Sequence, residues 1–212
     1  MATLDLQEQE QIDALKTWWK DNGKWLLLTL ALIVGGLAIF RGWQVYQNNQ
    51  AGEAATLYAA LEMQLASNDA TRVNDAATAV MDKFAATAYA PRAALLAAQV
   101  NIHVKDLARA KSQLQWVIDH AAESGLQNVA RLKLASVLLD EKNFADALKL
   151  LDTKTDEAYA GLYADLRGDV LTTQGKIEEA RTAYKQALDK TNAQSKYRNL
   201  IQMKLDALGS TQ

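Results

Sequence analysis

The side chains of this sequence best suited to proton transfer or metal binding are two histidines, His103 and His120. Histidine needs a second polar group held close by for either task. These two fall on different predicted helices, and neither has an acidic residue at metal-ligand spacing. The chain also has no cysteine, no glycine-rich phosphate loop and no Gly-x-Ser-x-Gly elbow. We therefore expect no enzyme activity, no metal and no cofactor.

Other polar side chains indicate binding rather than catalysis. Six of them occupy matching positions of a repeated helical pattern, so we expect them to share one face. These candidate partner-binding residues are Gln99, His103, Ser136, Asp140, Asp169 and Thr173. A mixed polar face of this kind suits a modest interface with another protein rather than a deep pocket. The alternative, which the sequence leaves open, is that these side chains are merely solvated.

The elements that would position these residues are pairs of helices that recur along the chain. In the segment 129–153, apolar residues at helical spacing stop at a charged turn, Asp140 to Asn143, and resume at Phe144. The pattern returns 33 residues later and 37 residues earlier. Each copy has a small residue in its first helix and, in its second, an alanine followed four positions later by a large residue. The small residues are Ala98, Ala135 and Gly168, and the second-helix pairs are Ala110 and Leu114, Ala147 and Leu151, and Ala180 and Tyr184.

A weaker fourth copy and a closing helix extend the array at its two ends. Residues 195–208 have an apolar face and are predicted to form a helix that caps the last pair. Self-similarity at this period is typical of tetratricopeptide-like helical hairpins, which bury their apolar faces by stacking. An irregular helical bundle is the alternative. The fourth copy would place Val73, Ala76 and Val80 34 residues before Leu107, Ala110 and Leu114.

The charge of the chain is close to balanced. Its 212 residues include 23 lysines and arginines and 25 aspartates and glutamates, which gives a formal net charge of -2. A protein that binds nucleic acid usually presents a strongly basic surface. We therefore expect no nucleic-acid partner.

The longest apolar run, Trp25 to Phe40, contains no charged residue and lies between Lys24 and Arg41. At about 1.5 Å per residue, a helix over this run spans roughly 24 Å, a little less than a ~30 Å hydrocarbon core. The flanking basic side chains can reach the headgroups, and Trp43 suits the membrane interface. This pattern predicts a transmembrane helix. A buried core helix and a signal peptide are the alternatives, although no small-residue cleavage site directly follows the run.

Basic residues on the two sides of this run predict its orientation. Lys16, Lys20 and Lys24 precede it, whereas Arg41 alone follows it closely. The flank richer in lysine and arginine usually stays in the cytoplasm. We therefore expect a cytoplasmic amphipathic segment over 1–23, a transmembrane helix over 24–46 and an exported tetratricopeptide-like domain over 47–212. The predicted fold class is all-α, with one transmembrane helix followed by a right-handed helical-hairpin array.

The segment before the apolar run has its own helical pattern. Apolar residues from Leu6 onward recur at helical spacing, and Asn22-Gly23 is a common way for a helix to end. We predict a short helix lying on the cytoplasmic leaflet; a frayed tail is the alternative. A short polar link, Tyr46 to Gln50, is expected after the membrane span.

Small residues within the apolar run fall on one face of the predicted helix. Ala31, Gly35, Ala38 and Gly42 follow one another at spacings of four, three and four. Such stripes allow two transmembrane helices to approach closely. We expect contact with a second copy or with another membrane protein; the alternative is that the stripe reflects the ordinary frequency of these residues in membranes.

Two stretches resemble a known family. The first is the run from Ile12 to Lys24, IDALKTWWKDNGK, followed at once by the apolar run, and the second is Tyr163 to Asp169, YADLRGD. In this order they resemble the YfgM family of proteobacterial inner-membrane proteins, which are ancillary subunits of the SecYEG translocon. The resemblance covers nearly the whole chain and supplies no catalytic residues.

The resemblance implies an inner-membrane protein with a cytoplasmic N-terminus and a periplasmic tetratricopeptide-like domain. It implies association with the SecYEG translocon and with the membrane-anchored chaperone PpiD, and a role in passing exported polypeptides to periplasmic chaperones. It also implies a link to envelope-stress regulation through the cytoplasmic tail. A scaffold for another cell-envelope assembly is the alternative hypothesis.

Overall fold

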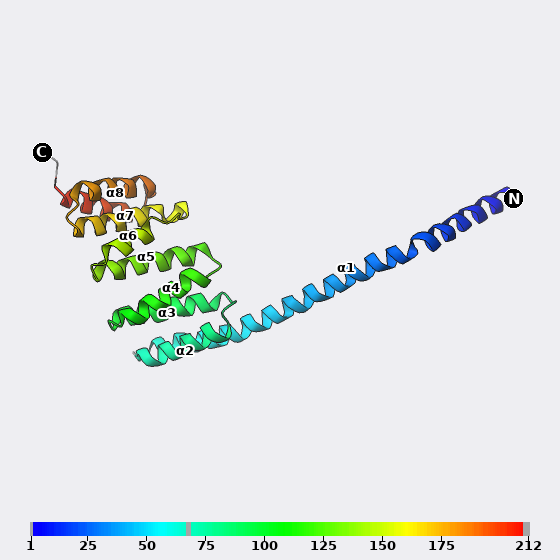
Figure 1. Cartoon of the computed structure of the whole chain (residues 1–212), viewed down its shortest axis with the longest axis horizontal. Coiled ribbons are helices and arrows are strands. Elements are labelled where there is room, and N and C mark those ends of the chain that lie inside the picture. The colour runs from blue at the N-terminus through cyan, green and yellow to red at the C-terminus, as the bar shows by residue number, and fades with distance from the viewer. Residues whose placement is uncertain (1, 67–68, 210–212) are drawn as a thin grey trace. The chain divides into compact units, whose positions relative to one another are not determined.

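The computed structural model describes residues 2–66 and 69–209 (Figure 1). Within this part of the chain the secondary structure consists of helices α1 to α9 and includes no strand. The predicted all-α fold is therefore confirmed. The chain divides into two compact units between Gln50 and Ala51.

Helix α1 spans Ala2–Leu65, so it runs past both ends that the sequence suggested. The helix does not end at Asn22-Gly23, and the stretch Tyr46 to Gln50 is helical rather than a link; both predictions were wrong. A single glycine costs a helix only about 1 kcal/mol relative to alanine. The missing side chain at Gly23 also leaves space for the Trp19 indole, because a Cβ at this position would lie 3.1 Å from that ring.

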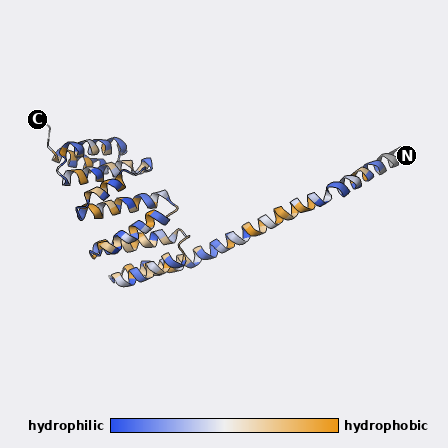
Figure 2. Cartoon of the chain, viewed as in Figure 1, coloured by the Kyte–Doolittle hydropathy of each residue, from blue (hydrophilic) through white to orange (hydrophobic). Residues whose placement is uncertain are grey.

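The apolar run of α1 is coloured as hydrophobic in Figure 2. Its side chains are exposed along the run in the first unit. Leu27 is 54% exposed, Ile33 is 60% exposed and Phe40 is 62% exposed. A core helix would bury these side chains, so the core-helix alternative does not fit. Among the described residues, α1 is the one helix long and apolar enough to cross a membrane. Its length and exposure fit a single-pass membrane protein.

The second unit is a stack of helices in which each one from α2 to α9 packs against the next (Figure 1). Short turns join α3 to α4, α5 to α6, and α7 to α8 as pairs, and the last turns of α1 pack with α2. Apolar side chains fill the stack from the end of α1 to α9. The helices are α2 (Ala70–Lys83), α3 (Tyr89–His103), α4 (Leu107–His120), α5 (Ser124–Asp140), α6 (Phe144–Leu151), α7 (Glu157–Thr173), α8 (Ile177–Lys190) and α9 (Tyr197–Ala207).

The same backbone turn recurs in the three later pairs. Helices α3, α5 and α7 each end two residues before a residue with positive φ, namely Lys105 at 65°, Lys142 at 59° and Gly175 at 76°. The residue after each of these is the N-cap of the second helix of the pair. The repeat predicted from side-chain patterns is therefore present in the backbone as well.

The small residue of each first helix makes room for the second helix. Ala98 and Ala135 are fully buried. At Gly168 even a methyl group would not fit, because a Cβ there would lie 2.4 Å from the ring of Tyr184. Close approach of the two helices therefore depends on a small side chain at this position, as the pattern predicted.

The first pair is formed by the last turns of α1 and by α2, and its predicted register was wrong. Asp69 caps α2 and Asp106 caps α4, which sets the two copies 37 residues apart rather than 34. In this register Ala77 is the counterpart of Leu114, and both are fully buried. Ala76 is only partly buried. A slip of three residues keeps nearly the same face of a helix, so the apolar spacing alone could not choose between Val73 and Ala76 as the counterpart of Ala110.

Three buried amide side chains join α2, α3 and α4. The Nδ2 of Asn101 donates hydrogen bonds to Oδ1 of Asn74 at 2.8 Å and to Oε1 of Gln113 at 2.7 Å. The Nε2 of Gln113 in turn donates to Oδ1 of Asn74 at 2.9 Å. Buried amides are costly unless paired, so this triad favours one alignment of the three helices.

Candidate interaction face

Three first helices, α3, α5 and α7, lie side by side because α5 contacts both of the others. The six predicted binding residues occupy two rows across these helices. One row is Gln99, Ser136 and Asp169, and the other, one helical turn further on, is His103, Asp140 and Thr173. We call the surface that these six residues mark the first-helix face.

Most of the first-helix face is accessible to a partner. Five of its six residues are exposed, and Asp169 alone is half-buried. The Ser136 hydroxyl donates to the carbonyl of Leu132 at 3.0 Å, and the Thr173 hydroxyl donates to the carbonyl of Asp169 at 2.8 Å. Both hydroxyls therefore use their proton within their own helix and offer a partner mainly their acceptor lone pairs.

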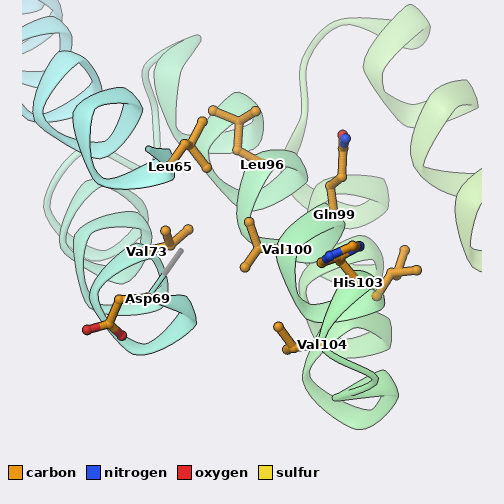
Figure 3. Close-up of a pocket in the computed structure, with 9 residues that line it drawn as sticks. Leu65, Asp69, Val73, Leu96, Gln99, Val100, His103 and Val104 are labelled. Atoms are coloured by element: carbon orange, nitrogen blue, oxygen red, sulfur yellow. The ribbon is translucent and has the colours of Figure 1, made fainter. Parts of the chain in front are cut away.

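A pocket of about 740 Å³ opens at one end of this face (Figure 3). Gln99 and His103 of α3 lie on one side of it, and Val73 of α2 faces Val100 across it. The pocket lies between the end of α1, α2 and α3, and of the six predicted residues it includes Gln99 and His103. The pocket is lined by Leu65, Asp69, Val73, Leu96, Gln99, Val100, Ile102, His103 and Val104.

The pocket combines apolar walls with a polar rim. Leu96 and Val100 are half-buried, whereas Gln99 and His103 are exposed. Ligand sites commonly have this composition, with apolar area for affinity and a few polar groups for orientation. Chemically, the arrangement can hold an apolar side chain while the rim hydrogen-bonds to the chain that carries it.

Asp169 belongs to an internal cluster rather than to a free binding surface. Its carboxylate accepts a hydrogen bond from the Tyr184 hydroxyl at 2.8 Å and another from Nζ of Lys204 at 2.8 Å. The same lysine reaches Asp165, also at 2.8 Å, and the Tyr197 hydroxyl donates to Asp165 as well. We call Asp165, Asp169, Tyr184, Tyr197 and Lys204 the α9 clamp, because they tie α9 to α7 and α8.

The protonation of the α9 clamp follows from burial and from its two carboxylates. Burial raises the pKa of Tyr184 and of Tyr197, and the nearby carboxylates raise it further. Burial alone would lower the pKa of Lys204, but its hydrogen bonds to Asp165 and Asp169 raise it on balance. Lys204 is therefore a firmly held cation at neutral pH, and both tyrosines are neutral donors.

The clamp gives a structural role in this chain to one of the two stretches that resemble a family. Asp165 and Asp169 are the two acids of YADLRGD, and their four-residue spacing puts them on one side of α7. Their contact with α9 was not predicted from the sequence. The feature that could have indicated it is Lys204, a cation in the middle of the apolar pattern of the last helix.

The two histidines have different surroundings. His120 stacks on Trp116 with ring centroids 4.4 Å apart and planes 9° apart, and its Nδ1 lies 2.9 Å from the Trp116 carbonyl oxygen. His103 is exposed at the pocket rim. No group of three His, Asp or Glu side chains could hold a metal ion in the part of the chain that the structure describes.

The small-residue stripe of α1 is open in the first unit. A Cβ added at Gly35 or Gly42 would meet nothing within 4 Å. Together with Ala31 and Ala38, these glycines leave a narrow flat strip on the helix. The strip remains a predicted contact site.

Comparison with known proteins covers nearly the whole chain. A family model described as a tetratricopeptide repeat-like domain matches residues 16–210. A protein of Neisseria gonorrhoeae named ancillary SecYEG translocon subunit is 35% identical over 208 residues, which are 96% of this chain and 98% of that protein. Proteins of the same name from Escherichia coli and Haemophilus influenzae are 31% and 28% identical, over 95% and 92% of this chain and 96% and 98% of their own.

No solved structure matches the chain significantly. The family match instead rests on sequence along almost the full length of chain and relatives, including both the apolar helix and the repeats. It agrees with the resemblance carried by the stretches 12–24 and 163–169. The chain belongs to the YfgM family of ancillary SecYEG translocon subunits, with a tetratricopeptide repeat-like domain.

Proposed function

We propose that this chain is a non-enzymatic subunit of the SecYEG translocon, anchored in the bacterial inner membrane by α1, and that its repeat domain binds partners in the periplasm. The observation that carries the proposal is the similarity to proteins named ancillary SecYEG translocon subunit, at 35% and 31% identity. That similarity spans both the apolar helix and the repeats, so it is more than the general likeness of repeat proteins.

The orientation rests on charge. Lys16, Lys20 and Lys24 precede the apolar run, and Arg41 follows it. This bias favours a cytoplasmic N-terminus and a periplasmic repeat domain. An exported polypeptide leaving the translocon would then emerge on the side of the membrane that holds the first-helix face.

The chemistry of that face is compatible with binding another protein. Exposed polar side chains such as Gln99 and Ser136 suit a reversible interface, and the pocket beside His103 suits a single apolar side chain. The resemblance to the YfgM family implies the chaperone PpiD and exported polypeptides as partners, and we assign this face to them. The chain would then hold a chaperone close to emerging polypeptides and need no chemistry of its own.

Affinity purification in mild detergent tests the proposal. The tagged full chain is expected to recover SecY, SecE and SecG together with PpiD. The double variant Gln99→Arg and Ser136→Arg places two bulky cations on the first-helix face and should lose PpiD, while α1 still retains the translocon. Gln186→Arg, an exposed change on α8, is the matched control and should recover both.

Two results would count against the proposal. Recovery of neither the translocon nor PpiD by the unaltered chain would refute it. Recovery of a different set of envelope proteins would instead support the scaffold alternative.

A further inference from the structure

We propose that a groove between α4 and α6, floored by α5, binds an acidic amphipathic segment of another protein. The groove has a volume of about 570 Å³. The groove shares α5 with the first-helix face, but none of the six residues of that face lines it. The proposal therefore does not depend on what that face binds.

The floor of the groove is apolar and largely buried. Leu134 and Leu138 of α5 are 6% and 8% exposed, and their four-residue spacing places them in a line along the groove. Half-buried Ile118 of α4 and Leu150 of α6 border this line on either side. Apolar side chains of a partner, spaced one helical turn apart, would fit along such a line.

The rim of the groove is mainly cationic. Lys111, Arg131 and Lys149 line it, one from each of its three helices, whereas Asp146 is the one carboxylate in the lining. The charge of Lys111 is compensated by Glu141, whose carboxylate lies 2.6 Å from the lysine Nζ. Lys149 is exposed and makes no ion pair with any described residue. This charge excess favours a partner with carboxylates beside its apolar residues.

The shape of the groove favours a protein segment over a membrane surface. Lys111, Gln115 and Ile118 lie at successive turns of α4, so the wall follows the length of a helix. An amphipathic helix can place its apolar side chains on the recessed floor and its carboxylates at the rim. A lipid surface is nearly flat on this scale and cannot reach Leu134 and Leu138 without disruption.

Peptide binding to the purified full chain in detergent tests the assignment. The probe is a fluorescent synthetic peptide of about four helical turns, with leucines along one face and glutamates elsewhere. The matched probe carries lysine in place of glutamate. We expect the acidic probe alone to bind, with an affinity that falls as salt increases. Lys149→Glu should weaken its binding about tenfold by opposing its carboxylates.

Lys185→Glu is the matched control, because Lys185 is an exposed cation on α8 that does not line the groove. It should leave the affinity unchanged, and circular dichroism should show both variants folded. Equal binding of the two probes, or equal weakening by the two substitutions, would overturn the proposal. So would a Lys149-dependent binding to anionic phospholipid vesicles in the absence of peptide binding.

Discussion

The side-chain ammonium of Lys204 in α9 lies 2.8 Å from the buried carboxylate of Asp165 in α7. The side chain of Asp165 is 3% exposed and that of Lys204 is 26% exposed, so water screens this pair only partly. One carboxylate oxygen, Oδ1 of Asp165, has no hydrogen-bond partner in the structure. The cation is therefore the main compensation for a charge that the repeat buries, and it fixes the last helix onto the stack.

Loss of this cation should destabilise the end of the repeat domain. Lys204→Met keeps most of the side-chain volume but leaves Asp165 buried without a counter-charge, so we expect a cost of roughly 3 kcal/mol. Urea unfolding of the purified chain, followed by circular dichroism, measures this cost. The exposed Lys185→Met should change stability by less than about 0.5 kcal/mol. An equally small effect of Lys204→Met would show that the clamp does not hold α9.

The clamp also predicts loss of stability at alkaline pH. The pKa values of Tyr184, Tyr197 and Lys204 are all raised in the folded chain. Each group therefore keeps its proton in the folded state after the unfolded chain has begun to lose it, so its contribution is complete below the unfolded pKa and declines above it. The free energy of unfolding should fall as pH rises beyond about 10.

Tyr197→Phe should make this decline shallower without abolishing it, because Tyr58 and Tyr163 also have raised pKa values. Urea unfolding at a series of alkaline pH values measures the slope. A slope that is unchanged in Tyr197→Phe would contradict the assignment of this tyrosine to the pH dependence.

Gly168 in α7 should not tolerate even a methyl side chain. In Gly168→Ala the new methyl group would lie 2.4 Å from the ring of Tyr184, and that ring is 2% exposed and held by a hydrogen bond to Asp169. We expect destabilisation by about 2 kcal/mol from overpacking. Gly52→Ala is the matched control, since a Cβ there meets nothing within 4 Å. It should instead stabilise its helix by up to about 1 kcal/mol.

The buried amide triad should be more sensitive to partial than to complete removal. Asn101→Leu leaves Oε1 of Gln113 and one N–H of Asn74 without a partner, although Gln113 still donates to Asn74, and this loss should cost about 2 kcal/mol. Replacing all three residues by leucine removes the unpaired groups and should recover part of that loss. Urea unfolding of the single and triple variants makes the comparison. A triple variant less stable than Asn101→Leu would show that shape, rather than hydrogen bonding, governs this site.

Much of the fold could be predicted because each repeat has the same packing requirement at the same position. Ala98, Ala135 and Gly168 lie at corresponding points of successive pairs, and each must be small for the two helices to meet. The predicted register failed at α2, where Val73 and Ala76, three residues apart, both fit the apolar spacing. There the cap residue Asp69 identifies the register.

The parts that could not be predicted depend on contacts between distant residues. Asp169 fits the polar row of the first-helix face by position, but Lys204 and Tyr184 draw it into the clamp. The pocket beside Gln99 needs the end of α1 and the start of α2 next to α3, which no local pattern specifies. The groove at Leu134 likewise exists only because α4 and α6 flank α5.

The placement of the repeat domain outside the cytosol is tested most directly by cysteine labelling, since the chain has no cysteine of its own. Ser136→Cys on α5 and Thr17→Cys on α1 each introduce one exposed thiol. With a membrane-impermeant maleimide and an intact inner membrane, we expect Ser136→Cys to be labelled from the periplasm and Thr17→Cys only after lysis. Labelling of Thr17→Cys in intact cells, with Ser136→Cys protected until lysis, would contradict the account.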